Sequence, residues 1–169
     1  MEYMFRDLKA NEIDVRVAMA KSNGVSLLLY KDARVDQDIL DETLGAYNWQ
    51  RHHSRDNANC IVSIWDKDKK QWIEKEDTGT ESFSESAKGL ASDSFKRSCF
   101  NWGIGRELYT APFIWIPSDK CNIESETKNG KPVYKCSDKF SVYGIEIVNK
   151  EIVHLAISNN GKVVFNWKK

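Results

Sequence analysis

Residues 82–109, SFSESAKGLASDSFKRSCFNWGIGRELY, give the clearest structural signal in the chain. Ser82 and Glu85 have the spacing of a capping box, which predicts that a helix begins here. Apolar side chains then recur every three or four positions, as on one face of a helix about six turns long. They are Phe83, Ala87, Leu90, Ala91, Phe95, Cys99 and Trp102. Gly103 suits the left-handed position that ends a helix, so the stretch predicts one long amphipathic helix.

The opposite face of this helix is polar and carries basic residues. Lys88, Ser92 and Lys96 are four positions apart and therefore share one side of the helix. Arg97 lies four residues after Asp93, so the Asp93 carboxylate is expected to orient the guanidinium and to neutralise part of its charge. Most charged helix faces are only solvated surfaces, which is the simplest interpretation from composition alone. The alternative is a row of fixed positive charges that binds an anion.

The composition limits the classes of function. A chain of 169 residues with 41% hydrophobic content predicts a single domain over residues 1–169 with a sizeable core. The formal net charge of zero argues against a generic basic nucleic-acid coat but allows a narrow basic track. Apolar runs are too short for a membrane span, and the start lacks a signal-peptide core, so we expect a cytosolic protein with no membrane partner. The four cysteines lack a CxxC motif, which predicts reduced thiols and no zinc site.

Patterns of alternating hydrophobicity and turn residues surround the helix. We expect strands at 12–18, 25–30, 49–55, 60–65, 71–80, 111–116, 139–148, 151–157 and 162–167, and a short helix at 36–44. Residues 1–12 are interpreted as a short helix or an arm. The polar segment 118–135 is interpreted as a loop insertion, either mobile or an extended hairpin. The sum is an α+β domain of antiparallel strands, one long helix and three terminal strands over 139–169.

Catalytic motifs are weak. The chain has no GxxxxGK[ST] phosphate loop, and the Gly-Ile-Gly at 103–105 follows a helix where a dinucleotide fingerprint follows a strand, so we expect no cofactor and no need for ATP. A metal-dependent nuclease would need carboxylates around a metal ion. Acidic residues are available at Asp66, Glu74, Glu76 and Asp77, but the Glu-x-Lys triplet of restriction-type nucleases does not occur there. The sequence therefore favours a protein that is not an enzyme.

The remaining signal is electrostatic. Basic side chains on the helix and the predicted strands can neutralise phosphates of a nucleic acid without reading its sequence. These residues are Arg16, Arg34, Arg51, Arg55, Lys88, Lys96, Arg97 and Arg106. The alternation over 49–55 also places His53 on the face of Arg51 and Arg55. Tyrosines such as Tyr30 would add base stacking of roughly 1–3 kcal/mol per base.

Residues 88–103, KGLASDSFKRSCFNWG, resemble the helix signature K-x-A-x-x-D-x-x-K-R-A-x-x-x-[FW]-G of the single-strand annealing proteins of the Rad-fifty-two superfamily. The small residue is Ala91, one place later than in the signature. The following GIGRELY is similar to bacteriophage and prophage members. Similar pieces precede the helix in the same order, namely LKANEIDVR at 8–16, YKDARV at 30–35, LGAYNW at 44–49 and EDTG at 76–79. The resemblance is strongest over 8–110.

The resemblance implies a curved antiparallel β-sheet packed on one long helix, with subunits assembled into a ring or filament. It implies that single-stranded DNA lies in an outer basic groove and that complementary strands are annealed without ATP, in phage homologous recombination and DNA repair. The location would be the host bacterial cytoplasm. Carried over by position, Arg16, Lys96 and Arg97 are the best DNA contacts, followed by Arg34 and Lys88. Phe100 stands where some members have a further arginine.

Further candidates and partners complete this hypothesis. Arg106 joins the predicted DNA contacts, with Arg51, His53, Arg55 and Tyr30 as secondary candidates. The implied partners are single-stranded DNA and further copies of the chain, and candidate partners are a single-strand-binding protein and a 5′–3′ exonuclease. The alternatives left open are a replication or recombination accessory module that acts through protein partners, and a metal-dependent nuclease.

Overall fold

The computed structural model describes residues 4–80 and 87–169, with side chains from residue 89 onward in the second range. The chain divides into two compact units. The helical unit consists of Met1–Asp7 and Asp32–Arg106, and the sheet unit of Leu8–Lys31 and Glu107–Lys169. Neither unit is one continuous segment, since the chain passes between them after Asp7, Lys31 and Arg106.

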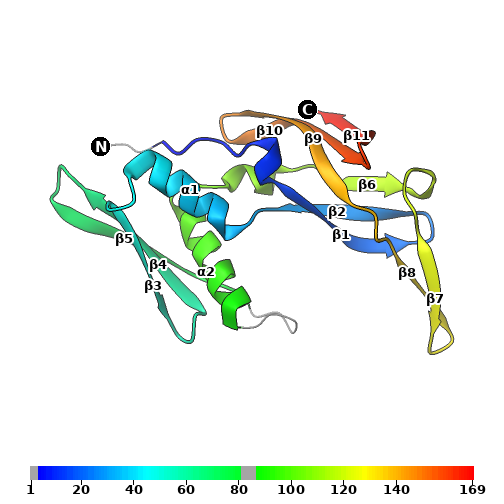
Figure 1. Ribbon diagram of the computed structural model, residues 1–169, viewed down its shortest axis with the longest axis horizontal. Helices are drawn as coiled ribbons and strands as arrows, with labels where there is room; N and C mark the ends of the chain where they lie inside the picture. Colours follow the sequence, from blue (N-terminus) through cyan, green and yellow to red (C-terminus); the bar gives the residue numbers. More distant parts are fainter. Residues whose placement is uncertain (1–3, 81–86) are drawn as a thin grey trace. The chain divides into compact units, whose positions relative to one another are not determined.

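The helical unit combines two α-helices with a three-stranded antiparallel sheet (Figure 1). The helices are α1 (Ala33–Leu44) and α2 (Ala87–Asn101), and the strands, in sheet order, are β3 (Trp49–Ser54), β4 (Asn59–Asp66) and β5 (Gln71–Thr78). Helix α1 begins three residues earlier than expected, because the Asp32 side chain accepts a hydrogen bond from the Arg34 backbone N–H and caps it. The helix ends at Gly45, whose φ of 79° is in the left-handed region.

Helix α2 packs against β4 and β5 through the apolar stripe expected from the sequence. Leu90, Phe95 and Cys99 are buried, while Ala91 and Trp102 are half-buried. The described helix stops at Asn101, and Gly103 follows with a φ of 94°, which confirms the predicted end. The capping box of Ser82 and Glu85, with Phe83, lies outside the described residues.

The sheet unit is built on six antiparallel strands in the order β11-β10-β9-β1-β2-β6. Their bounds are β1 (Asp14–Lys21), β2 (Gly24–Tyr30), β6 (Ile114–Pro117), β9 (Phe140–Val148), β10 (Glu151–Asn159) and β11 (Lys162–Lys168). The three terminal strands match the predicted ones closely. Positive φ angles at Asn149 and Lys150, and at Asn160 and Gly161, fit the two-residue turns that join them. The expected arm at 1–12 has no helix or strand from Met4 to Lys9 and ends in a 3-10 turn, Ala10–Glu12.

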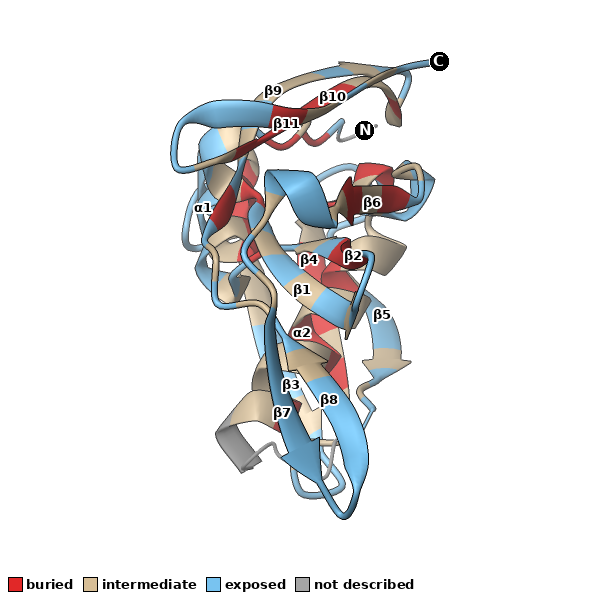
Figure 2. Ribbon diagram, turned by 90° about the vertical axis from the view of Figure 1, so that its right-hand side faces the viewer, coloured by how far each residue is buried: buried red, intermediate tan, exposed pale blue. Residues whose placement is uncertain are grey.

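The core of the sheet unit is supplied by its own strands. Figure 2 shows buried segments in β6, β10 and β11. The fully buried cluster is Val25, Leu27, Ile114, Ile116, Phe140, Ile152, Leu155, Ile157 and Val164. The edge strands β6 and β11 approach each other, although they are not neighbours in the strand order, so the sheet bends around this core. All residues of this unit are described, and its only helices are 3-10 turns, of which Ser118–Lys120 is one.

The predicted insertion at 118–135 is an extended hairpin. Its strands β7 (Glu124–Lys128) and β8 (Lys131–Lys135) are exposed almost throughout (Figure 2). They are joined by Asn129 and Gly130, both with positive φ. Lys135 bonds Glu126 at 2.7 Å and lies 3.5 Å from Glu124, so cross-strand ion pairs hold the hairpin.

The α+β class and the antiparallel pairing are confirmed. The expected single sheet with one long helix differs from the structure, whose described residues form three sheets and two α-helices. The long helix α2 packs on the three-stranded sheet, β3-β4-β5. Periodicity gives the strands, but it does not say which distant strands pair, and this is why the sequence did not separate the sheets. Neither α-helix in the described ranges has the length and apolar character needed to cross a bilayer.

Candidate nucleic-acid interface

Arg97 is held in place by two partners in the helical unit. Its Nε donates to Asp93 Oδ2 at 3.0 Å, and its Nη2 donates to the Thr80 hydroxyl at 2.8 Å. The same Asp93 oxygen accepts the Thr80 backbone N–H at 2.8 Å. The expected pairing of Asp93 with Arg97 is therefore confirmed. The Arg97 side chain remains 40% exposed, so it is oriented yet still partly accessible.

Gly79, the last residue of the EDTG segment at 76–79, lies in close contact with α2. A Cβ placed on Gly79 would lie 2.9 Å from the Ser94 backbone nitrogen and 3.1 Å from Asp93 Oδ2. Contacts this short to backbone atoms cannot be relieved by moving a side chain, so only glycine allows the chain to pass so close to α2. This passage brings Thr80 to Asp93. Two of the sequence pieces that carry the resemblance therefore meet at one carboxylate.

Lys96 and Arg34 both lie near Asp32, at the start of α1. Arg34 Nε and Nη2 donate to the two Asp32 carboxylate oxygens at 3.0 and 3.1 Å. These hydrogen bonds, with a smaller contribution from the charge of Lys96, lower the pKa of Asp32 to about 2. Lys96 is half-buried and Arg34 is exposed. Adjacent helix positions are about 100° apart, which explains why Lys96 faces Asp32 while Arg97 faces Thr80.

The secondary candidates on β3 pack against α2. The Arg51 guanidinium lies 4.6 Å from the centre of the Phe95 ring, and the Trp49 ring stacks on Phe95 at 6.1 Å. His53 Nδ1 lies 3.3 Å from the Ser94 hydroxyl. Burial, together with the nearby charge of Arg51, lowers the pKa of His53, which favours the neutral ring. Strand β3 ends at Ser54, and Arg55 lies in the following turn with a φ of 52°, so the predicted shared face stops at His53.

Arg106 binds the carboxyl end of α2. Its Nε donates to the Phe100 carbonyl at 2.8 Å and its Nη2 to the Asn101 carbonyl at 3.0 Å. Lys75 of β5 also donates to the Asn101 carbonyl, at 2.9 Å. Cations at this end complement the helix dipole and satisfy carbonyls that have no partner within the helix. Arg106 therefore has a structural role that the sequence interpretation did not include.

Two serines on the buried face of α2 were also missed. The Ser98 hydroxyl donates to the Lys75 carbonyl at 2.7 Å and accepts the Val62 backbone N–H at 3.1 Å. The Ser94 hydroxyl donates to the Asn57 carbonyl at 2.8 Å. Both serines are fully buried. They are four residues apart beside Phe95 and Cys99, and this spacing of small polar residues next to the apolar stripe is the signal that could have revealed a close helix–sheet contact.

Arg16 and Tyr30 lie in the sheet unit, at a groove of about 370 Å³. The groove is lined by residues 13–17, Tyr30 and residues 136–141. Arg16 is exposed on β1, and Tyr30, at the end of β2, is 42% exposed. Asp14 faces Tyr30 in the β1–β2 register, and Arg16 faces Leu28. These two predicted contacts thus share one face of the same strand pair.

The structure thus divides the candidate residues between the two units, and Arg51, His53, Arg55 and Arg106 belong to the helical unit. Arg34 with Lys96, and Arg97 with Asp93, belong to the helical unit, while Arg16 with Tyr30 belongs to the sheet unit. The Lys88 side chain lies outside the described residues. The acids of the nuclease alternative are divided between the faces of β5. Glu74 accepts from Ser63 on one face, and Asp77 accepts from Asn101 of α2 on the other.

Comparison with protein-family models, with curated proteins and with solved structures finds no match to this chain.

Proposed function

We propose that this protein binds single-stranded DNA without ATP and anneals complementary strands as a homo-oligomeric ring or filament. The observation that carries the proposal is the junction of Asp93, Arg97 and Thr80. It joins the residue that directly follows the EDTG segment to the basic helix, and it leaves an oriented and partly exposed Arg97 side chain.

The physical logic of annealing fits this arrangement. Two DNA strands repel each other through their phosphates, so their association needs charge neutralisation and no covalent chemistry. Guanidinium and ammonium groups fixed by a helix can supply this neutralisation while leaving base edges outward. In a ring or filament many weak sites act in register, and the combined affinity rises through avidity. The neutral net charge of the chain suits such a system, because each subunit needs only a narrow basic track.

The test replaces the two central cations of α2. In a Lys96→Ala/Arg97→Ala double variant, single-stranded DNA binding should fall to background and strand annealing should stop. Since each lost phosphate contact reduces the salt slope, the dependence of log K on log salt should also become shallower by roughly one per cation. Fluorescence anisotropy of a labelled oligonucleotide at several salt concentrations measures both quantities, and electron microscopy with and without DNA tests for rings or filaments.

A matched control separates position from charge. Lys67→Ala/Lys162→Ala removes the same formal charge from exposed residues at the β4–β5 tip and on β11. This variant should bind and anneal like the wild type. Circular dichroism should show the folded state in both variants, since the Asp93–Thr80 hydrogen bond survives loss of Arg97. Wild-type DNA affinity in the Lys96→Ala/Arg97→Ala variant would contradict the proposal.

A second candidate function is an accessory module that binds a protein partner. Exposed aromatic rings of the sheet unit favour it, since Phe113 is 77% exposed and stacks on Trp115, and Tyr109 is 73% exposed. Aromatic side chains are enriched in protein interfaces. Under this alternative, Phe113→Ser would abolish a partner interaction, and the wild-type protein would not anneal complementary oligonucleotides.

A further inference from the structure

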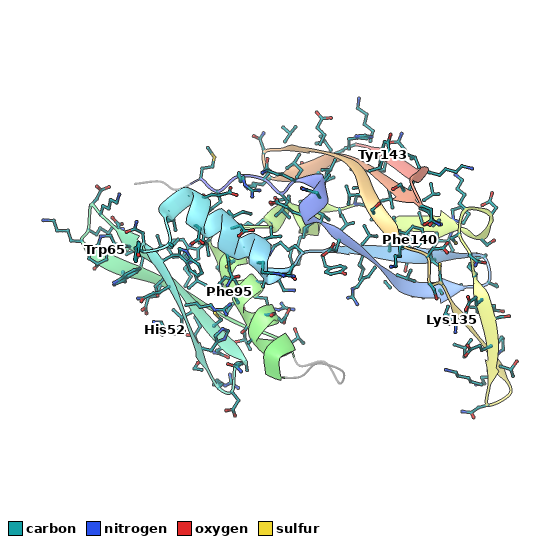
Figure 3. The ribbon with its side chains drawn as sticks, viewed as in Figure 1. His52, Trp65, Phe95, Lys135, Phe140 and Tyr143 are labelled. Carbon is teal, nitrogen blue, oxygen red and sulfur yellow. The ribbon has the colours of Figure 1, made fainter. Side chains whose placement is uncertain are left out.

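The groove of the sheet unit exists because two neighbouring strands separate. Strands β1 and β9 pair at Asp14 and Ser141. Beyond this pair, the chain leading into β9 runs beside β1 without further described ladder pairs, and the groove lies between them. Figure 3 labels Phe140, the first residue of β9, at this point. A groove beside a strand can accept an extended ligand.

The register across the groove sets two cations opposite each other. In an antiparallel arrangement, one step forward on β1 corresponds to one step back on the other segment. Extending the register of the Asp14–Ser141 pair past the last paired residues matches Arg16 with Lys139, and both residues line the groove and are exposed. Directly opposed like charges are unfavourable in a sheet. Within the described part of the chain, neither side chain has a hydrogen bond or an ion pair.

One of the two acidic residues of the groove is engaged by neighbouring asparagines. Asp138 accepts hydrogen bonds from the Asn122 N–H and the Asn159 side chain, both at 2.8 Å, and neither asparagine lines the groove. Both bonds are made to Oδ2, so this oxygen is engaged by groups outside the groove. The lining thus holds two cations, Arg16 and Lys139, and two carboxylates, Asp14 and Asp138, of which Asp138 already has partners. An anion between the two cations would relieve their repulsion.

We propose that Lys139 is a further phosphate-binding residue, which forms with Arg16 a clamp for one phosphate group of single-stranded DNA. The inference rests on the proposed function and adds a residue and a groove that the sequence resemblance does not include. Tyr30 lies on the same face, two pairs from Arg16 and Leu28, where its ring can stack on the adjoining base. Ser137 and Ser141 line the same groove and can donate hydroxyl hydrogen bonds to phosphate oxygens.

The test compares Lys139→Ala with Lys162→Ala, which removes an exposed lysine from β11 in the same unit. The probe is a short fluorescein-labelled oligothymidylate. For single strands, log K changes by about 0.7 per phosphate contact for each decade of salt, so losing one contact should weaken binding about fivefold at 0.1 M salt. Lys139→Ala should show this loss and a shallower salt slope, whereas Lys162→Ala should bind like the wild type.

Two further readouts separate a phosphate clamp from a structural role. Lys139→Ala should leave the melting temperature of the DNA-free protein unchanged or raise it, because it removes a like-charge contact. In an Arg16→Ala/Lys139→Ala double variant, the loss of affinity should be smaller than the product of the single losses, since both residues act on one phosphate.

The outcomes distinguish this inference from the proposed function. If the wild-type protein binds the oligonucleotide and Lys139→Ala binds equally well, the clamp is wrong while DNA binding by α2 stands. A lower melting temperature together with fully multiplicative losses would also overturn the clamp, since Lys139 would then act on stability. If the wild-type protein does not bind single-stranded DNA, both proposals fail.

Discussion

The candidate DNA contacts of the helical unit and those of the sheet unit have different surroundings. In the helical unit, Arg34 is bonded to Asp32, Arg97 to Asp93 and Thr80, and Arg106 to backbone carbonyls. In the sheet unit, Arg16 lines a groove together with a second cation, Lys139. A paired guanidinium is oriented but partly neutralised, whereas an unpaired one keeps its full charge. The first arrangement supplies direction for a phosphate contact, and the second supplies net charge.

The two units also hold their cores differently. The interface of α2 with β4 and β5 combines the aromatic ring of Phe95 with buried hydroxyls of Ser94 and Ser98 that bond to the sheet backbone. The core of the sheet unit is an apolar cluster of strand residues. Buried hydrogen bonds are directional and apolar packing is not. Helix α2, which carries the candidate DNA contacts, is therefore fixed in position as well as buried.

The largest expected effect tests whether the two units are independent. Phe95 is fully buried between Trp49 and Arg51, so Phe95→Ala should lower the free energy of unfolding by about 3–5 kcal/mol. Because neither unit is one continuous segment, we expect the loss to appear in both units as a single cooperative transition. Urea unfolding followed by hydrogen exchange of peptides from each unit measures this.

Leu155→Ala is the matched variant in the sheet unit. Leu155 is fully buried on β10, and its truncation should cost about 2–5 kcal/mol through the same transition. Two separate transitions, each shifted by only one of the variants, would show that the units fold independently. The prediction of one domain over residues 1–169 would then be wrong.

An intermediate effect tests the polar attachment of α2. Ser98→Ala would leave the Val62 N–H and the Lys75 carbonyl, which face each other across β4 and β5, without their hydroxyl partner. Two buried groups without hydrogen bonds predict a loss of about 1–3 kcal/mol. The control is Ser158→Ala in the sheet unit, where the hydroxyl bonds only to Ser141, at 3.0 Å. Ser141 is exposed and can turn to solvent, so a smaller loss of about 0.5–1.5 kcal/mol is expected.

Thermal unfolding of both serine variants gives the comparison. Equal losses would mean that the hydroxyls of α2 are no more important than an ordinary side-chain hydrogen bond. The difference between the two units would then rest on their charges alone.

Local features of the fold could be predicted from the sequence, and long-range ones could not. Alternating hydrophobicity located the three terminal strands within a few residues, and Gly45 and Gly103 correctly marked helix ends. The division into three sheets escaped prediction, because the pairing of β1 with β9 joins residues more than a hundred positions apart. Local periodicity carries no information about such pairs.

The candidate site shows the same limit. The spacing of Asp93 and Arg97 was enough to predict their ion pair. The role of Thr80 depends on the close passage of Gly79 beside α2, and the position of Lys139 depends on the β1–β9 register. Both follow from tertiary structure. The bonds of Arg106 to the end of α2 were within reach of the sequence, since a cation just past a helix end is a known capping arrangement.

The smallest expected effect tests whether the cations of the helical unit are truly paired. Hydrogen bonds from Arg34 hold the pKa of Asp32 at about 2, below its ordinary value of 3.8. A lowered carboxyl pKa stabilises the folded state above the ordinary value, and this contribution disappears as the pH falls from about 4 through about 2. Asp32→Asn keeps a good helix cap but removes the ionised carboxylate, so stability at neutral pH should fall modestly, and the loss of stability between these pH values should become shallower. An NMR titration of the Asp32 carboxyl should give a midpoint near 2. A midpoint near 3.8 would show that Arg34 does not bond to Asp32. Arg34 would then be an unpaired cation of the helical unit, as Arg16 is in the sheet unit. If Arg34 contributes to DNA binding, Asp32→Asn should also tighten binding modestly, because it removes a negative charge beside both Arg34 and Lys96.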